Sequence, residues 1–493
     1  MNTADYLLEA GGDSRPAFIA NKTTYTYRDV RDASARIVAE LIAAGVRPTD
    51  RVAIFGNNSI FWAAAYLATL KLGAVAVPFA TTLTTDTIAA MQAFVGCKVV
   101  CAEQKVYRRF AGGFPADLPT IFDDILSQPG AREWPVANET DLHADAALMF
   151  TSGTTAQPRA VRITNRNIQA NTNSIIEYLT LSEAERMGVI LPFFYCFGTS
   201  LLHSHLRVGG TLVLSNTFVY PETTLDLMEA TNCTGFAGVP STYQTLLRNS
   251  TFPKRELKSL RKVQQAGGKL QTVLIQELIA AVKYGEVFVM YGQTEATARL
   301  SHLPPKLLAT KLGSIGRGIP GVTLRVIGED GNPVKPGDVG EIYAWGDNIS
   351  PGYLNEPEVN AQKFVDGCLH TSDLATVDED GFLFVVDRKA DFIKSYGYRV
   401  SSQQVEGCIV EMPDVVACAA IGEPDLVRGE AICAFVVLRT GATTTARDVI
   451  AHCTERLPSY MVPKDVNFIE RLPTNAHGKV VKNELRKMVA QTA

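Results

Sequence analysis

A strand, a helix and a second strand follow one another between residues 51 and 77, and this order constrains the fold most strongly. Residues 51–55 form a short apolar run, 59–72 are long enough for a buried helix, and 74–77 form a second apolar run before Pro78. Two strands connected through a helix lie parallel in one sheet, and the helix covers one face of it. The pattern therefore predicts an α/β protein built on parallel, helix-covered sheets.

The length of the chain predicts more than one domain. Its 493 residues exceed what a single hydrophobic core usually organises. Between residues 322 and 353, short strands alternate with turns rich in glycine and proline, which predicts a small antiparallel sheet or barrel. Strands within 415–437 and a helix at 449–457 predict a further, smaller α+β unit.

The charge and the apolar stretches exclude several classes of protein. A formal net charge of −4 gives no electrostatic case for binding nucleic acid or an anionic membrane. The most apolar stretch, 61–80, contains Lys71, Gly73 and Pro78, so we expect no transmembrane segment. No basic and then apolar leader begins the sequence, and the nine cysteines lack a C-x-x-C pair. We therefore expect a cytoplasmic protein with reduced thiols.

An apolar run at 146–150 is followed by a loop of small residues. The loop consists of Thr151, Ser152, Gly153, Thr154 and Thr155. Hydroxyls and closely approaching backbone N–H groups can hold phosphate oxygens, and Arg159 adds a positive charge. The loop lacks the G-x-x-x-x-G-K-[ST] pattern of a Walker loop. It is a candidate phosphate site, and a polar surface loop is the alternative.

This loop and several later segments together resemble the adenylate-forming superfamily of acyl-CoA synthetases, aryl-CoA ligases and peptide-synthetase adenylation domains. The later segments are QQAGG at 264–268, YGQTEA at 291–296, HTSD at 370–373, DRKADFIK at 387–394 and LPTNAHGK at 472–479. They occur in the family's order. The chain departs from the family pattern at Ala156, at Arg159 in place of lysine, and at Ala390 in place of Asp or Lys.

The resemblance implies a nucleotide site. Its residues would be Thr151, Ser152, Gly153, Thr154, Thr155, Arg159, Gly267, Gly268, Tyr291, Gly292, Gln293, Thr294, Asp373, Arg388 and Lys479. Tyr291 would stack on adenine, while Asp373 and Arg388 would hold the ribose. Glu295 and Thr154 would hold the Mg²⁺ that neutralises the triphosphate.

The same resemblance assigns the catalytic roles to Thr294, Glu295, Lys394 and Lys479. Lys479 would bridge the carboxylate and the α-phosphate while acyl-AMP forms. Lys394 would serve the later transfer of the acyl group to the thiol. Tyr396 and Gly397 would line the route of the incoming thiol.

Residues 192–198, PFFYCFG, imply an acyl pocket. In the resembling family this segment walls the pocket, and the set here would be Phe194, Tyr195, Phe197, Gly198, Gly267 and Gly292. An aromatic wall without an obvious charged selector predicts an apolar acid. A fatty acid of medium or long chain is the first choice, and an aryl acid is the alternative.

The resemblance also implies the domain plan. A large N-terminal AMP-binding domain, 1–387, would hold helix-covered β-sheets and a small barrel. Residues 388–391 would form a hinge, and 392–493 a small mobile α+β C-terminal domain.

The predicted function is an ATP-dependent carboxylic acid–thiol ligase that uses ATP, Mg²⁺ and coenzyme A. It would form acyl-AMP, release pyrophosphate and transfer the acyl group to the thiol. Three alternatives stay open: an aryl acid–CoA ligase, a ligase for a phosphopantetheinylated carrier protein, and a protein that binds ATP or acyl-AMP without turnover. The sequence does not decide the oligomeric state, and a homodimer stays open.

Overall fold

The computed structural model describes residues 1–110, 112–128, 133–136, 140–151, 159–388, 391–475 and 478–490. Within these ranges no helix combines the length and the apolar character needed to cross a membrane. All nine cysteines lie within them, and each is buried and free of a disulfide.

A six-stranded sheet contains the predicted β-α-β unit. Its strands are β3 (Arg51–Phe55), β4 (Val75–Phe79), β5 (Val99–Ala102), β6 (Thr120–Phe122), β7 (Asp145–Thr151) and β8 (Arg159–Thr164). Their order is β6-β5-β3-β4-β7-β8, and β3 pairs in parallel with β4. Helix α3 (Ile60–Lys71) connects these two strands, as predicted, and the Ser59 side chain caps its first turn.

We call the part of the chain up to Arg388 the large body. A nine-stranded sheet forms its second layer. Its strands are β1 (Pro16–Ala20), β2 (Thr23–Thr26), β9 (Arg186–Val189), β10 (Thr211–Leu214), β11 (Gly235–Gly238), β12 (Lys262–Gln265), β13 (Glu286–Tyr291), β14 (Ser301–Leu303) and β15 (Arg317–Gly318). The order is β15-β14-β13-β12-β11-β9-β10-β1-β2. The interior strands pair in parallel, and antiparallel strands close both edges.

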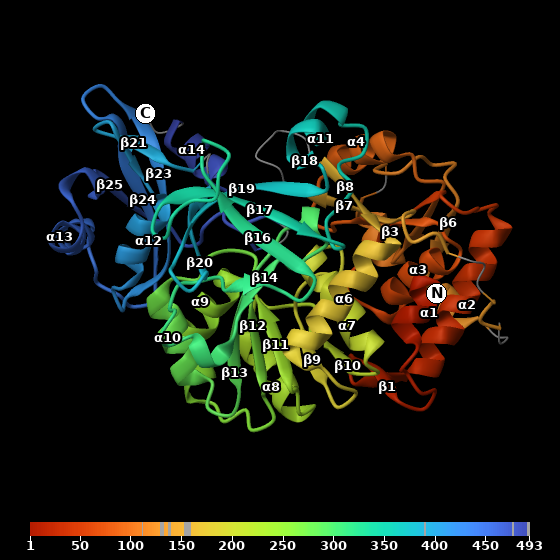
Figure 1. Cartoon of the computed structure of the whole chain (residues 1–493). Coiled ribbons are helices and arrows are strands. Elements are labelled where there is room, and N and C mark those ends of the chain that lie inside the picture. Colours follow the sequence, from red (N-terminus) through yellow and green to blue (C-terminus); the bar gives the residue numbers. More distant parts are fainter. Residues whose placement is uncertain are drawn as a thin grey trace.

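Helices cover both sheets (Figure 1). They are α1 (Thr3–Leu8), α2 (Tyr27–Ala43), α4 (Thr85–Val95), α5 (Gln104–Arg109), α6 (Asn165–Leu179), α7 (Cys196–Arg207), α8 (Pro221–Ala230), α9 (Pro240–Arg248) and α10 (Thr272–Ala281), besides α3. Every residue of α3 is buried, as expected for a helix that is apolar all round.

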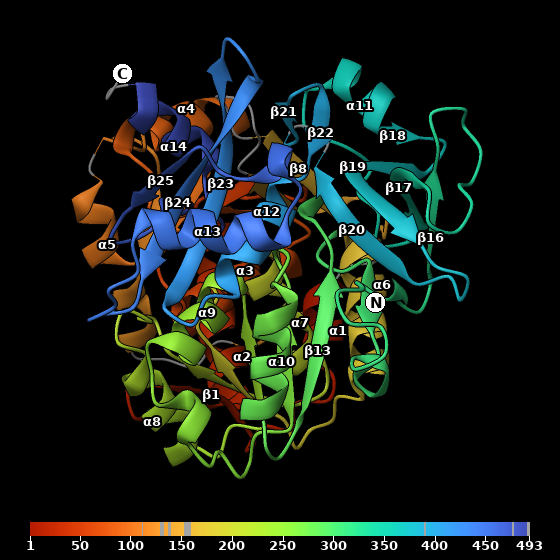
Figure 2. The same ribbon diagram turned by 90° about the vertical axis from the view of Figure 1, so that its left-hand side faces the viewer.

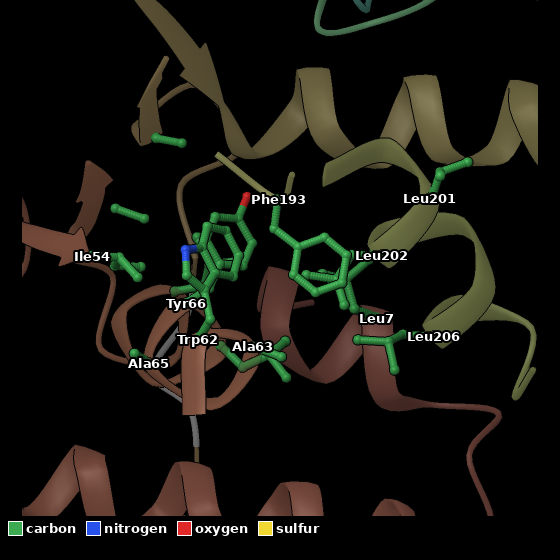
Figure 3. Packing of buried hydrophobic residues seen from close by; sticks show 14 of the residues in the cluster. Leu7, Ile54, Trp62, Ala63, Ala65, Tyr66, Phe193, Leu201, Leu202 and Leu206 are labelled. Atoms are coloured by element: carbon green, nitrogen blue, oxygen red, sulfur yellow. The ribbon is translucent and has the colours of Figure 1, made fainter. Parts of the chain in front are cut away.

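The core around α3 reaches the segment that enters α7. Trp62 and Tyr66 stack with their ring centroids 5.4 Å apart, and Phe193 lies 5.4 Å from Trp62. Figure 3 shows Phe193 between these rings and the leucines of α7, Leu202 among them. Phe193 is therefore a core residue that fixes the start of the segment leading to the cavity described below.

The predicted small antiparallel sheet is present. It contains β16 (Val322–Ile327), β17 (Val339–Gly346), β18 (Phe364–Val365), β19 (Cys368–Val377) and β20 (Leu383–Arg388), with α11 (Pro357–Lys363) beside it. All of its pairings are antiparallel.

The C-terminal part folds as the predicted smaller α+β unit. It comprises β21 (Ile393–Ser395), β22 (Tyr398–Val400), β23 (Val415–Asp425), β24 (Gly429–Leu438), β25 (Asp465–Phe468), α12 (Ser402–Val410), α13 (Ala446–Arg456) and α14 (Lys482–Ala490). It lies against α9 and α10 of the large body (Figures 1 and 2). Arg248 of α9 donates to the carbonyl of Pro413 at 3.0 Å across this contact.

Two local features bear on the ends of these elements. Helix α2 begins at Tyr27, where Thr26 and Asp29 form a reciprocal capping box. Arg159 is the first residue of β8, and it pairs with Thr151 at the end of β7. The mixed α/β architecture with a barrel-like antiparallel sheet and a small C-terminal unit is confirmed.

Candidate active site

A cavity of about 820 Å³ lies where strand ends of the large body meet the C-terminal part. Its lining residues are Thr151, Arg159, Tyr195, Cys196, Phe197, Ala266, Gly267, Gly292, Gln293, Thr294, Glu295, Ala298, Arg299, Glu341, Tyr353, Val359, Gln362, Lys363, His370, Thr371, Ser372, Asp373 and Lys479. Parallel strands direct their following loops to one edge, so segments far apart in sequence converge there.

The short helix η3 (Thr294–Ala296) places a carboxylate in the wall. Glu295 is buried, and the Tyr353 hydroxyl donates to its Oε1 at 2.6 Å. Burial and the Glu295 charge hold the pKa of Tyr353 well above its ordinary value, so this hydroxyl stays protonated. Glu295 is therefore held as an oriented oxygen ligand.

Two cationic side chains, Arg159 and Lys479, line the same cavity. Arg159 places its guanidinium 5.5 Å from the ring centroid of Tyr353. Lys479 lines the cavity from the C-terminal part. Burial raises the pKa of the Cys196 thiol, while its hydrogen bond with Thr294 and the nearby Lys479 charge act in the opposite direction. The Cys196 Sγ to Thr294 Oγ1 distance is 3.4 Å. Lys479 and Thr294 therefore both lie near Cys196 in the lining of the cavity.

Gly478, the residue directly before Lys479, contacts the large body. Ser241 at the start of α9 donates to the carbonyl of Gly478 at 3.0 Å. Gly478 has φ +75°, and a Cβ there would lie 3.0 Å from Val239. Asn475 accepts from the Lys479 backbone N–H at 3.0 Å. Glycine at 478 is required for this close approach, which directs the following lysine into the cavity.

The candidate ribose site lies where β13 meets β19. The Tyr291 hydroxyl donates to Asp373 Oδ2 at 2.6 Å, and Asp373 is buried. The backbones of Asp373 and Arg388 are register partners between β19 and β20. Asp373 lines the cavity and Tyr291 lies directly behind it.

Other predicted residues fall into two groups at this cavity. Gln293, Gly267, Gly292, Tyr195 and Phe197 line it, as does Thr151. Gly268, Phe194 and Gly198 do not. A Cβ at Gly198 would lie 2.0 Å from the carbonyl oxygen of Pro192, so this glycine serves the close packing of α7. Of the predicted phosphate loop, Ser152, Gly153, Thr154 and Thr155 lie outside the described residues, as does the side chain of Arg388.

The residues predicted for the thiol route lie elsewhere. Lys394 and Tyr396 are exposed, and Gly397 follows them at the turn between β21 and β22. Tyr396 lines a separate cavity of about 300 Å³ with Arg428 and Tyr460. Residues predicted for the nucleotide site therefore lie together at the cavity, whereas those predicted for the thiol route lie away from it.

Among the lining residues that sequence reasoning did not assign to the site are Cys196, Arg299 and Tyr353. Arg299 is 1% exposed, and its guanidinium carbon lies 3.9 Å from the ring centroid of Phe197. An arginine four residues after Glu295, among small apolar neighbours, was the available signal. Arg299 therefore places a charged side chain beside Phe197, a residue of the segment in which the sequence showed no obvious charged selector.

The donor set fits an anionic substrate together with a divalent cation. Arg159 and Lys479 supply positive charge, and the buried Gln293 Nε2 has no hydrogen-bond partner among the described residues. The Glu295 carboxylate is a hard oxygen ligand of the kind that Mg²⁺ prefers.

Comparisons with known proteins agree with this geometry. The family model of the AMP-binding enzymes matches residues 9–354, and the model of their C-terminal domain matches residues 404–479. A feruloyl-CoA synthase from Amycolatopsis sp. is 34% identical over 490 residues, covering 94% of each chain.

A solved relative is the o-succinylbenzoate CoA synthetase of Bacillus subtilis in complex with its acyl-adenylate intermediate. It superimposes with a TM-score of 0.86 at 29% identity, covering 98% of each chain. The same enzyme with ATP and magnesium gives a TM-score of 0.85 at 29% identity, covering 98% of this chain and 99% of that one.

Proposed function

This chain belongs to the family of AMP-binding enzymes and is an AMP-forming acid–thiol ligase that uses ATP and coenzyme A, and we propose that its acid substrate is aromatic. The observation that carries the proposal is the single cavity that joins Lys479, Thr294 and Glu295 to the aromatic side chains of Tyr195 and Phe197.

In the first half-reaction, a carboxylate oxygen attacks the α-phosphorus of ATP and pyrophosphate leaves. Both reactants are anions, so the site must offset their repulsion. Lys479 lies where it can contact both groups, Thr294 donates to the α-phosphate, and Arg159 holds the departing phosphates. Glu295, fixed by Tyr353, would hold Mg²⁺ with the predicted help of Thr154, and the ion would neutralise the triphosphate.

In the second half-reaction, the thiol sulfur attacks the acyl carbonyl carbon and AMP leaves. Lys394, Tyr396 and Gly397 are exposed and away from the cavity. We place the hinge at 388–391, between the domains 1–387 and 392–493. Rotation of the C-terminal domain about this hinge would move Lys479 out of the cavity and bring Lys394, Tyr396 and Gly397 to it. Coenzyme A is the acceptor, and a carrier-protein phosphopantetheine remains the alternative.

An aromatic acid replaces the fatty acid that was the first choice from sequence. Two of the relatives carry the names feruloyl-CoA synthase and o-succinylbenzoate CoA synthetase, which are names of ligases for aromatic acids. Phe197 and Tyr195 meet edge to face with ring centroids 6.5 Å apart, and both line the cavity.

An isotope-exchange screen tests this proposal. Radiolabelled pyrophosphate is exchanged into ATP in the presence of single acids, half aromatic and half aliphatic, with Mg²⁺. Thioester formation with coenzyme A is then measured for the active acids. We expect exchange with aromatic acids and subsequent AMP release. Exchange confined to aliphatic acids contradicts the substrate class, and exchange with none contradicts the ligase function.

A further inference from the structure

Helices α12 and α13 of the C-terminal part pack against each other (Figure 2) and bring together three side chains of the kinds that bind metal ions. Cys408 lies on α12, Glu411 directly follows the last residue of that helix, and His452 lies on α13. One ligand atom of each side chain lies within 4.8 Å of the other two. None of the three residues lines either of the cavities described above, so the cluster is separate from the candidate active site.

Helix geometry places these side chains at one point. Cys408 and Glu411 are three residues apart, and the backbone of Glu411 keeps helical angles, with φ −58 to −61° being typical of such a turn and ψ −24° here, so both side chains lie on one face of α12. On α13, Val449 and Cys453 are buried, and His452 lies three residues after the first and directly before the second. The cluster is therefore held by two packed helices rather than by a loop.

The imidazole of His452 is oriented as in a metal ligand. Its Nε2 lies 2.9 Å from the carbonyl oxygen of Cys408 and 3.6 Å from Oε2 of Glu411. A carbonyl can only accept, so Nε2 donates and the lone pair of the neutral ring is on Nδ1. A histidine that binds a metal through one ring nitrogen usually donates from the other to a carbonyl or carboxylate.

The types of ligand indicate which ion would bind. A thiolate, an imidazole and a carboxylate together suit Zn²⁺, whereas Mg²⁺ and Ca²⁺ prefer oxygen ligands alone. Burial raises the pKa of the Cys408 thiol, so the thiol is protonated without an ion. An incoming dication would displace this proton to solvent, and the thiolate and the Glu411 carboxylate would then balance its two positive charges.

The other contacts of these residues leave the cluster open to an ion. Arg456 lies 3.6 Å from Glu411, yet it also pairs with Glu455 at 2.9 Å, and pairs at such exposed positions contribute little. The thiol of Cys453 hydrogen-bonds with that of Cys408. Each contact accounts for one residue, but together they do not account for three different ligand types at one point.

We infer that Cys408, Glu411 and His452 bind a Zn²⁺ ion that links α12 to α13, with water in the fourth position. The ion has a structural role, since it connects two helices of the C-terminal part outside the candidate active site. The inference does not depend on which acid the enzyme activates.

Two measurements on the whole chain test the inference, and neither depends on enzyme activity. The purified protein is stripped of metal, and its Zn²⁺ affinity is measured by competition with a chromogenic chelator. Excess Mg²⁺ is present throughout, so that it occupies the oxygen ligands around Glu295. Co²⁺ then replaces Zn²⁺, because a cobalt–thiolate bond gives a charge-transfer absorption band that oxygen and nitrogen ligands do not give.

We expect the wild type to bind one Zn²⁺ per chain, to melt at a higher temperature with the ion, and to show the cobalt–thiolate band. Cys408→Ser, Glu411→Gln and His452→Gln should each weaken Zn²⁺ binding by about 100-fold or more, because even a hydrogen-bond partner of a ligand contributes about 10- to 100-fold. Cys408→Ser should also abolish the band. The controls are Cys233→Ser, at a buried thiol outside the cluster, and His143→Gln, at an exposed histidine, and both should bind as the wild type does.

Three results would overturn the inference. The first is a wild type that binds less than one Zn²⁺ per chain, and the second is Co²⁺ binding without the thiolate band. The third is unchanged Zn²⁺ affinity in Glu411→Gln and His452→Gln. These two variants alter exposed or half-buried side chains, so they keep the test decisive if Cys408→Ser does not fold. Melting temperatures of the metal-free proteins show which variants fold.

Discussion

Replacing Tyr353 by phenylalanine removes one hydroxyl and keeps the ring on which Arg159 lies. That hydroxyl donates to Glu295 Oε1 at 2.6 Å, and the two side chains are only 3% and 8% exposed. A buried hydrogen bond to a charged group contributes about 1.5–3 kcal/mol, which corresponds to a factor of roughly 10 to 150 in an equilibrium or a rate.

The loss should appear in the first half-reaction. Without its donor, Glu295 is no longer fixed as a ligand, so we expect Tyr353→Phe to lower kcat/KM for ATP in pyrophosphate exchange by about 10- to 150-fold. The Mg²⁺ concentration needed for half-maximal exchange should rise as well.

A matched control separates this effect from lost stability. Tyr243 is also buried, and its hydroxyl donates to the Gln264 carbonyl at 2.7 Å outside the cavity. Tyr243→Phe should lower the melting temperature by a similar amount and leave exchange unchanged. Full exchange activity in Tyr353→Phe would refute the reasoning, because Glu295 would then need no fixed orientation.

Three further predictions concern Gly478, the exposed Lys394 and the free energy of unfolding at alkaline pH. Gly478→Ala should slow pyrophosphate exchange by roughly 5- to 30-fold, because its φ of +75° strains an alanine, and retained exchange would contradict it. Lys394→Ala should leave exchange intact and lower thioester formation from supplied acyl-AMP by about 100-fold, and equal losses in both assays would exclude the separate role. The free energy of unfolding should fall as pH rises above about 10, because tyrosines ionise there only in the unfolded chain. Burial raises the pKa of Tyr6 to about 12 and that of Tyr66 further, so the folded state keeps these protons. Urea midpoints that stay constant over this range would refute it.

Local pattern was enough to predict much of the fold. The β3-α3-β4 unit follows from apolar runs of the right length around a helix that Ser59 caps. The antiparallel sheet from β16 to β20 follows from the short strands and turns between them. Both depend on neighbours in sequence, which periodicity and turn chemistry report directly.

The candidate site was predicted where a residue belongs to a recognisable motif. Thr294, Glu295, Asp373 and Lys479 were placed by resemblance, and they line one cavity. Nothing in the sequence near Lys479 indicates that Gly478 contacts Ser241. The two residues lie 237 positions apart in the sequence.

Tyr353 and Arg299 were missed for a physical reason. The role of Tyr353 depends on a hydroxyl that meets Glu295 only after folding. The contact of the Arg299 guanidinium with Phe197 likewise forms only in the folded chain, and a buried arginine appears the same in sequence as a solvated one. Such features depend on burial and three-dimensional neighbours, which composition and spacing do not report.

The central claim is that Lys479 joins the carboxylate to the α-phosphate in the first half-reaction and takes no part in the second. Measuring both half-reactions of Lys479→Ala tests it most directly, with Lys487→Ala on the exposed face of α14 as the control. The account predicts that pyrophosphate exchange falls by about 100- to 1,000-fold while thioester formation from supplied acyl-AMP stays near the wild-type rate. Full exchange activity, or an equal loss in the two half-reactions, would contradict it.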